Sequence, residues 1–202
     1  MNAKLGGLVV CSLVMLAGCG GTSDDAVSPD EATAPVEAAA AAEMLGGGVL
    51  TPVHDGDAGS PHVQVSWEVD GATISISYGR PFLKGRIVGE SVEPLDGAVW
   101  RLGADEATTL TTDRDLMIGA AHVPAGEYTL WTLSDGATTE LIVNSETGQW
   151  GTSYDAARDL GRTTMTVGTL DTPADQLTFH VDDSEIRAEW GTMVASVPIM
   201  VH

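Results

Sequence analysis

VQVSWEVDGATISISY, residues 63–78, alternates apolar and polar side chains on both sides of an Asp70-Gly71 pair. Alternation with a period of two places the apolar side chains on one face of a strand and the polar ones on the other. An Asp-Gly pair favours a two-residue hairpin turn, because both positions tolerate a positive φ. The stretch therefore predicts two antiparallel strands with one buried face.

Further short apolar runs follow this hairpin at regular spacing, separated by turn sequences such as Pro124-Ala125-Gly126. The expected strands are Ala107–Thr112, Leu116–Ile118, Tyr128–Leu133, Thr139–Val143, Thr163–Val167, Gln176–Val181, Ile186–Trp190 and Val194–Val201. Helical periodicity is almost absent, and a helical turn is expected only within Tyr154–Leu160. The pattern predicts an all-β, antiparallel sandwich or jelly-roll-like domain over residues 60–202. Trp67, Trp131 and Trp190 lie within expected strands and are predicted to be core or half-core residues.

The charge of the chain excludes one class of partner. Its 202 residues include 29 acidic and 9 basic side chains, which gives a formal net charge of −20. Nucleic-acid binding needs clustered Lys and Arg to neutralise phosphates, so we expect no DNA or RNA partner. The 2 cysteines cannot make a disulfide scaffold, and no Cys-x-x-Cys pair is present.

The beginning of the chain has the pattern of a secretory leader. Lys4 precedes the apolar run Leu5–Leu16, which is shorter than the roughly 20 residues that span a bilayer. The run ends in Leu16-Ala17-Gly18-Cys19, which resembles the lipobox of bacterial lipoproteins. The resemblance implies a signal peptide over residues 1–18, a lipid on Cys19 and an extracytoplasmic, membrane-anchored protein, at the outer membrane in a bacterium with two membranes. An ordinary signal peptide with a chance cysteine is the alternative.

Residues 19–59 predict a disordered tether. From residue 20 to residue 59 the chain has eight acidic residues, no Lys or Arg and no aromatic residue. Such a composition buries too little apolar surface to offset the conformational entropy lost on ordering. Within it, Pro35–Leu45 predicts at most a transient helix.

Basic residues are concentrated in one stretch of this acidic chain. Arg80, Lys84, Arg86 and Arg101 fall within 22 residues, the first three in a Gly/Pro loop that follows an expected strand. Four cations repel one another unless something anionic lies among them. Internal pairs with Asp105-Glu106 would satisfy them, and so would an anionic ligand held in the loop.

A second polar cluster and the histidines offer weaker candidates. Trp150 and Tyr154 lie in a Gly-rich loop that suits stacking against a sugar or peptide, or a plug for one end of the sandwich. His62 is a candidate ligand or base. The spacing of the histidines contains no His-x-His or His-Glu-x-x-His, and no nucleophile or phosphate-binding motif is present. The sequence therefore predicts no metal, no cofactor and no catalytic residue.

Seven segments in order are similar to the bacterial family known as domain of unknown function 2911. They are Ser60-Pro61-His62, Tyr78-Gly79-Arg80-Pro81, Lys84-Gly85-Arg86, Val99-Trp100-Arg101, Glu106-Ala107-Thr108-Thr109, Pro124-Ala125-Gly126-Glu127-Tyr128 and Gly148-Gln149-Trp150-Gly151-Thr152-Ser153-Tyr154-Asp155. The resemblance covers about Ser60 to Val201 and implies a secreted, largely β domain without an established activity. This chain departs from the family pattern at Leu102 and Asp105.

Three function classes remain at this stage. The first is a tethered envelope module that binds a small anionic or sugar ligand through Arg80, Lys84, Arg86 and Arg101, with His62, Glu106, Trp150 and Tyr154 nearby. The second is a structural or envelope-protein-binding domain in which these residues pair internally. The third is a hydrolase with His62 or Glu106 as its general base. The missing nucleophile and metal motifs weigh against the hydrolase, and the binding module is the function that we expect.

Overall fold

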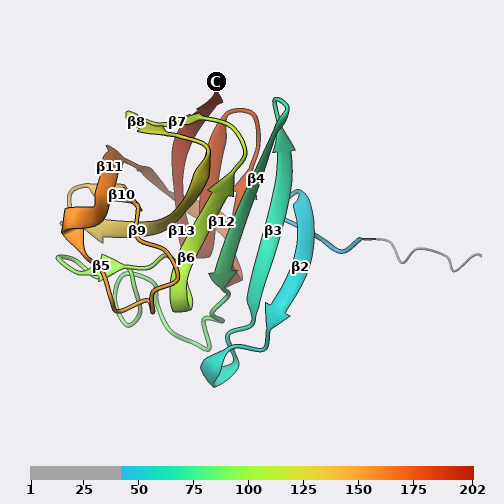
Figure 1. Ribbon diagram of the computed structural model, residues 1–202. Coiled ribbons are helices and arrows are strands. Elements are labelled where there is room, and N and C mark those ends of the chain that lie inside the picture. The colour runs from blue at the N-terminus through green and yellow to red at the C-terminus, as the bar shows by residue number, and fades with distance from the viewer. Residues whose placement is uncertain (1–41) are drawn as a thin grey trace, which may run out of the picture. The chain divides into compact units, whose positions relative to one another are not determined.

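The computed structural model describes residues 42–202. Over these residues the chain forms strands and two 3₁₀ turns, which confirms the all-β prediction (Figure 1). The expectations for the signal peptide, for Cys19 and for the first part of the tether lie outside the described residues. The strands are β1 (Met44–Leu45), β2 (Gly48–His54), β3 (His62–Val69), β4 (Ala72–Gly79), β5 (Val99–Trp100), β6 (Ala104–Thr112), β7 (Leu116–Ile118), β8 (Ala121–Val123), β9 (Gly126–Ser134), β10 (Thr139–Asn144), β11 (Asp159–Thr164), β12 (Thr166–Val181) and β13 (Glu185–Val201).

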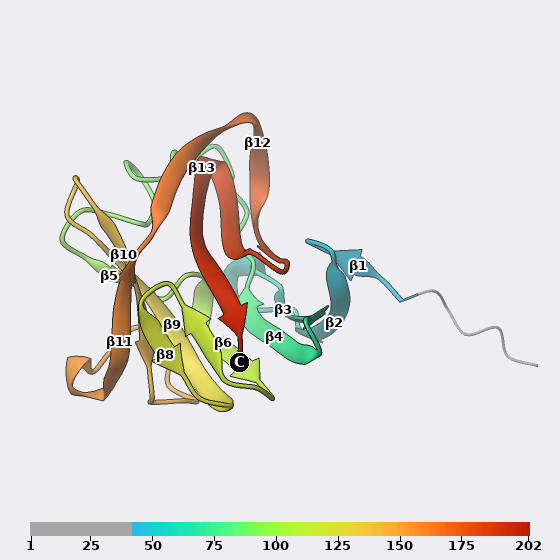
Figure 2. The same ribbon diagram turned by 90° about the horizontal axis from the view of Figure 1, so that it is seen from above.

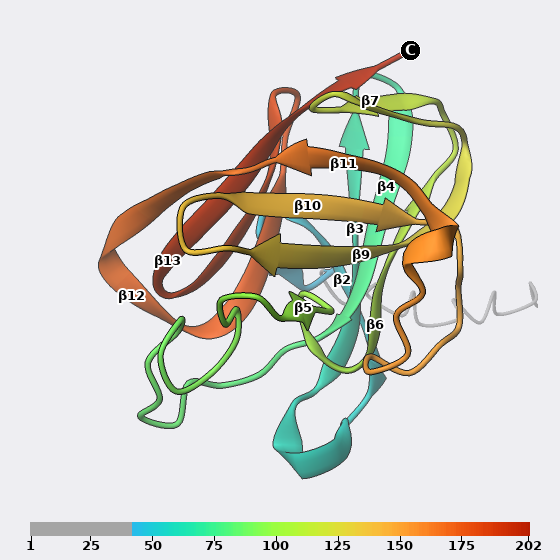
Figure 3. The same ribbon diagram turned by 90° about the vertical axis from the view of Figure 1, so that its left-hand side faces the viewer.

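Two antiparallel sheets make up the fold. The larger has the order β1-β2-β3-β4-β6-β9-β10-β11, with β5 added beside β9, and the smaller has the order β12-β13-β7-β8. The larger sheet is strongly twisted, so that β9, β10 and β11 run across the direction of β3 and β4 (Figure 3). The long β12–β13 hairpin faces the first strands of this sheet (Figure 2). This arrangement is a β-sandwich.

The core lies between the two sheets. Alternate residues of β3 and β4 face it, as the opening stretch of sequence predicts, and Val65, Ile74, Ile76 and Tyr78 are fully buried. The other sheet contributes Leu177, Phe179 and Trp190, among others. Trp67, Trp131 and Trp190 are at most 4% exposed, which confirms their prediction as core residues. Asp70 and Gly71 both have positive φ in the β3–β4 turn, as expected of this dipeptide.

The tether prediction is wrong for its last part. Residues 44–54, expected as part of a disordered tether, form β1 and β2, and β2 pairs with β3 from Val49↔Ser66 to His54↔His62. The Trp67 indole donates to the Gly46 carbonyl at 2.9 Å, and this bond fixes the β1–β2 turn on the core. β2 is exposed over most of its length and contains Pro52, both typical of an edge strand. An edge strand of this kind lacks the apolar alternation by which a strand is recognised in a sequence.

Two other expectations need adjustment. The strands expected at Ile186–Trp190 and Val194–Val201 form one strand, β13, whose pairing shifts register at Gly191. The helical turn expected within Tyr154–Leu160 is the 3₁₀ turn Ala156–Arg158, and the Asp155 side chain caps it by accepting from the Ala157 amide. Between residues 42 and 202, no helix has the length and apolar character needed to cross a membrane.

Candidate functional site

A cavity of about 230 Å³ opens at the end of the sandwich where β4 and β5 end and β6 begins. Arg101 follows β5, Trp190 comes from β13, and Arg86 comes from the loop that leaves β4. The strand β13, far along the chain, thus meets the β4–β5 region at this opening. The lining residues are Asp57, Ser60, Pro81, Arg86, Val92, Glu93, Trp100, Arg101, Gly103, Ala104, Asp105 and Trp190.

Arg101 is held in place through its backbone and its aliphatic stem. Its carbonyl accepts from the Thr108 amide at 3.3 Å. The loop after β10 passes so close that a Cβ at Gly151 would overlap the Arg101 Cδ, and the Gly151 amide donates to the Asp105 carbonyl at 3.0 Å. Only glycine allows this approach, so Gly151 fixes the direction of the Arg101 side chain.

Two donors in this cavity have no acceptor among the described residues. The Arg101 Nε is buried and has no hydrogen-bond partner. The indole Nε1 of Trp190, a residue that is 1% exposed, also has none, although the neighbouring Trp100 donates its Nε1 to the Gly103 carbonyl at 3.1 Å. The two indoles stack with ring centroids 5.7 Å apart. Buried donors usually have partners, so these two mark a place where an acceptor is missing.

The charge of Arg101 is not neutralised by direct pairing. The bidentate pair of Arg101 with Asp105 or Glu106, one of the two expectations, does not form. Within residues 42–202, none of the ion pairs shorter than 4 Å includes Arg101. Burial lowers the pKa of Arg101, while the negative charges of Asp105, Glu93 and Glu106 oppose this shift. Asp105 itself has a positive φ and accepts from the Asp57 amide at 2.9 Å, so it fastens the β2–β3 loop to the site.

Of the other expected basic residues, Arg86 lines this cavity, whereas Arg80 and Lys84 do not. Arg86 lines the cavity and donates to the Leu83 and Phe82 carbonyls of its own loop. Arg80 points elsewhere: it donates to the Leu177 carbonyl at 3.0 Å and to Thr178 Oγ1 at 3.1 Å, so it joins β4 to β12. Lys84 lies in the exposed turn after β4 and is not among the lining residues.

Glu106 and His62 meet beside the cavity, together with His54. Glu106 carries its carboxylate between the two imidazoles, 3.4 Å from His54 Nε2 and 3.2 Å from His62 Nδ1. The histidine rings stack with centroids 4.9 Å apart. Burial lowers the pKa of His62, and the charge of Glu106 acts in the opposite direction. His62 is therefore a neutral imidazole at neutral pH.

Trp150 and Tyr154 do not form a wall of the cavity. Trp150 is 45% exposed, and its backbone forms a β-bridge with Glu106. Tyr154 packs on Trp131 with ring centroids 5.2 Å apart. Its hydroxyl contacts both Asp159 oxygens, at 2.8 and 2.9 Å, and receives a hydrogen bond from Arg162. Burial and Asp159 raise the pKa of Tyr154 to about 12. Tyr154 belongs to a structural cluster.

Residues 60–199, which carry this site except for His54 and Asp57, match the family described as Protein of unknown function (DUF2911). The chain belongs to the DUF2911 family. The match confirms the resemblance drawn from the seven sequence segments. No curated protein and no solved structure matches the chain. The fold and the site of this DUF2911 protein therefore have to be interpreted from its own residues.

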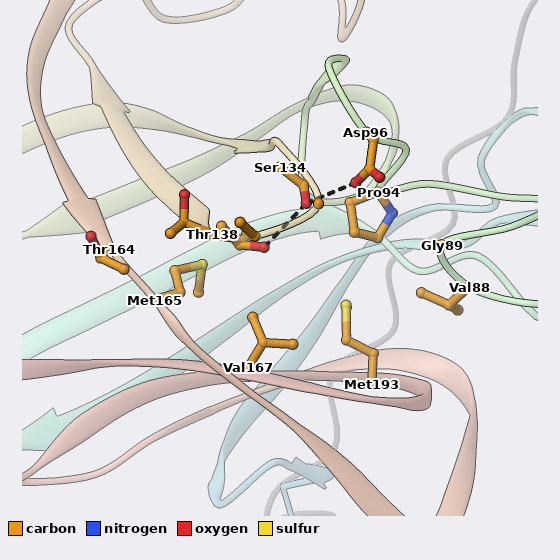
Figure 4. A pocket seen from close by; sticks show the side chains of 13 residues that line it. Val88, Gly89, Pro94, Asp96, Ser134, Thr138, Thr164, Met165, Val167 and Met193 are labelled. Atoms are coloured by element: carbon orange, nitrogen blue, oxygen red, sulfur yellow. Dashed lines mark hydrogen bonds between the residues drawn. The ribbon is translucent and has the colours of Figure 1, made fainter.

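A larger cavity of about 460 Å³ lies elsewhere on the DUF2911 domain. Met165, Val167 and Met193 form one side of it, and Ser134 and Asp96 form the other (Figure 4). Asp96 contributes the one charge among its lining residues and accepts from Ser134 Oγ at 3.2 Å. With no Arg, Lys or His in its lining, this cavity lacks the groups that recognise an anion.

Two residues of this candidate site are not predicted as site residues by the sequence. His54 lies in the stretch assigned to the tether, and the seven family segments do not include it. Trp190 was predicted only as a core residue, because a sequence does not show which buried indole lacks an acceptor. Among the expected site residues, the structure brings Arg86 and Arg101 into one cavity and places His62 and Glu106 in contact with each other.

Proposed function

We propose that this protein binds a small organic anion in the cavity lined by Arg86, Arg101 and Trp190, and that a lipid on Cys19 tethers it outside the cytoplasm. The observation that carries the proposal is the pair of unpartnered buried donors, Arg101 Nε and Trp190 Nε1. A buried donor without an acceptor costs about 1–3 kcal/mol, and a ligand oxygen that accepted from either donor would recover part of that free energy. Hydrogen bonds from guanidinium to a carboxylate or phosphate are also among the strongest in proteins.

The remaining lining residues narrow the ligand class. Asp57, Glu93 and Asp105 add carboxylates to the same cavity, and these accept hydrogen bonds from hydroxyl groups. The stacked Trp100 and Trp190 rings add an apolar wall. A ligand that presents a carboxylate to the arginines and hydroxyls to the acids matches both sets. The volume of about 230 Å³ equals nearly eight waters at about 30 Å³ each, which leaves room for a hydroxy acid or a small sugar acid.

Binding can be tested with four probes. L-malate, D-glucuronate and inorganic phosphate are compared with D-glucose, a neutral match for glucuronate, by calorimetry and by melting temperature. We expect at least one of the three anions to bind at one site and glucose to bind more weakly. A ligand at 100 times its Kd stabilises the fold by ~2.7 kcal/mol.

Variants locate the binding. Arg101→Gln and Trp190→Phe are expected to weaken the affinity for the bound anion at least tenfold, because each removes one of the two donors. Arg158→Gln removes the same charge from an exposed 3₁₀ turn and serves as the matched control. If none of the anions binds, or if Arg101→Gln binds as wild type does, the structural or protein-binding domain is the better description.

Anchoring has its own test. The Leu16-Ala17-Gly18-Cys19 sequence supports lipidation of Cys19, and two or more acyl chains hold a protein stably at a membrane. Cells that express the full chain are labelled with a fatty-acid analogue and fractionated. We expect label and protein in the membrane fraction for wild type, and unlabelled protein outside that fraction for Cys19→Ala. Unlabelled wild-type protein would refute the anchor and leave the ligand site unaffected.

A further inference from the structure

We propose that His54, His62 and Glu106 form a binding site for a divalent first-row transition metal, for which Zn²⁺ is the probe. The three side chains come from the end of β2, the start of β3 and β6. Their ligand atoms all lie within 4.8 Å of one another. Two imidazoles and one carboxylate are a donor set that Zn²⁺ uses with one position left open.

The topology of the sheet brings these residues together. β3 and β6 both pair with β4, so His62 and Glu106 lie on either side of that strand. The β4 residue paired with His62 is Gly79, which puts no side chain between them. β2 adds His54 directly opposite His62. Because the three ligands are contributed by three strands, no short spacing motif reveals the site.

Two atoms of the cluster are buried without a proper partner. His62 is 5% exposed, and both its Nδ1 and the Oε2 of Glu106 lack a hydrogen bond among the described residues. They lie 3.2 Å apart, an ion-pair distance at which the carboxylate acts on the imidazole mainly through its charge. Ligands of one tetrahedral Zn²⁺ ion, at about 2.0–2.1 Å from it, lie at about this separation from each other. A metal ion would satisfy both atoms at once.

The surroundings of His62 suit a ligand that binds through Nδ1. Its other nitrogen, Nε2, lies 3.1 Å from Ser77 Oγ. With Nδ1 on the metal, Nε2 carries the ring proton and donates it to that hydroxyl. Metal-bound histidines usually donate their second N–H to such a partner, which fixes the tautomer and the orientation of the ring. Ser77 is therefore a positioning residue for the metal.

His54 has to change its tautomer when the ion binds. Its Nδ1 accepts from the Gly56 amide at 3.0 Å, so the ring proton is on Nε2, the atom that faces Glu106. Binding through Nε2 moves this proton to Nδ1 and releases the Gly56 amide to water. His54 and its loop are exposed, so this exchange leaves no buried group unpaired. The side chains of His54 and Glu106 are 44% and 41% exposed, so one side of the site is open to water or a further ligand.

The other histidine–carboxylate pairs in the described part of the chain lack this arrangement. His122 pairs with Asp115 alone and His180 with Glu189, and neither pair has a second imidazole. His122→Asn is thus a matched control, because it removes an exposed histidine next to one carboxylate. A surface histidine that bound Zn²⁺ adventitiously would behave like His122.

The test is a calorimetric titration of the purified full chain, stripped of metal with a chelator, with Zn²⁺. We expect one ion per chain for wild type, an affinity at least tenfold lower for His54→Asn and for Glu106→Gln, and wild-type affinity for His122→Asn. Both loss variants change exposed or half-exposed side chains, so they should fold, which their melting curves will check. Co²⁺ should give the visible absorption of a four- or five-coordinate ion in wild type and not in His54→Asn.

Ser77→Ala separates a built site from chance binding. Loss of a hydrogen bond to a metal-bound imidazole typically lowers metal affinity 10–100-fold, and we expect a loss in this range. Absence of a one-to-one Zn²⁺ complex, or His54→Asn binding as tightly as wild type, would overturn the proposal. The same titration with malate instead of Zn²⁺ tests the anion cavity separately.

Discussion

Two clusters of this sandwich each combine arginine with tryptophan, and they differ in whether their polar atoms have partners. In the closed cluster, Asp159 accepts hydrogen bonds from Tyr154, Arg162 and Asn144, and Trp131 donates to Thr129. In the open cluster, which comprises Arg86, Arg101 and Trp190, the donors Arg101 Nε and Trp190 Nε1 have no acceptor within residues 42–202.

The difference separates a structural role from a binding role. A satisfied polar network such as the one around Asp159 makes the fold rigid and offers little to a ligand, although Gln149 Oε1 beside Thr129 has no partner among the described residues. A buried donor without an acceptor carries a free-energy cost that a ligand can remove. Residue type and sequence spacing do not distinguish the two cases, since Tyr154 and Arg101 were both expected in the site.

The largest effect is expected from breaking the closed cluster. Asp159→Ala removes one of the two acceptors of the fully buried Asn144 amide, which keeps the Asp155 carbonyl, and the acceptor of the Tyr154 hydroxyl. We expect the free energy of unfolding to fall by about 2–4 kcal/mol, measured by urea denaturation. Arg101→Gln in the open cluster should cost less than about 1 kcal/mol, because no protein hydrogen bond is lost. Equal losses in the two variants would remove the distinction between the clusters.

A matched pair of tryptophan substitutions sharpens the comparison. Trp131→Phe and Trp190→Phe both shorten a fully buried ring, but only the first removes a made hydrogen bond, from Nε1 to Thr129 Oγ1 at 3.0 Å. We therefore expect Trp131→Phe to lower stability by about 1 kcal/mol more than Trp190→Phe does. The measurement is again urea denaturation. A larger loss for Trp190→Phe would mean that its Nε1 has a partner in solution.

The smallest effect concerns how the Tyr154 hydroxyl of the closed cluster makes the stability of the fold depend on pH. The folded protein raises the pKa of Tyr154 to about 12, chiefly by burial and through the Asp159 carboxylate, while an unfolded tyrosine titrates near 10. The stability from the neutral phenol is therefore complete below about pH 10 and is lost as pH rises from about 10 to about 12.

The Tyr154 contribution is isolated by a variant. Burial also raises the pKa of Tyr78 and Tyr128. Ionisation of each of the three tyrosines at high pH therefore destabilises the folded protein. Urea denaturation between pH 9 and pH 12 should show a steeper decline for wild type than for Tyr154→Phe. Parallel curves would show that Tyr154 titrates normally in the folded protein.

The sequence predicts strands well where one face is buried. The β3–β4 hairpin follows its alternation residue by residue, and its Asp70-Gly71 turn has the expected φ values. The sequence does not predict β1 and β2, because β2 is mostly exposed. The free edge of β3 and the hydrogen bond from Trp67 to Gly46 fix the position of β2. Both of these features lie outside the β2 sequence itself.

The residues of the candidate site are likewise predicted only in part from the sequence. The concentration of cations leads to Arg86 and Arg101, because charge in an acidic chain is visible in the sequence. Trp190 and His54 were not found as site residues, since their roles depend on which atoms lack partners and on which strands pair. Arg80 shows the opposite error: its position in the cationic stretch suggested a ligand, and it binds the backbone of β12 instead.

The early start of the folded domain sets how far the proposed anchor can reach. β1 begins at Met44, so on the proposed lipidation of Cys19 only 25 residues separate the membrane from the first strand. Fully extended, they span at most roughly 85 Å, whereas a tether up to residue 59 would span roughly 135 Å. β2 then carries the chain about 20 Å from Gly48 to His54. On that proposal, the two proposed sites lie at the His54 end of β2, and the extended segment and β2 together place them at most roughly 105 Å from the bilayer.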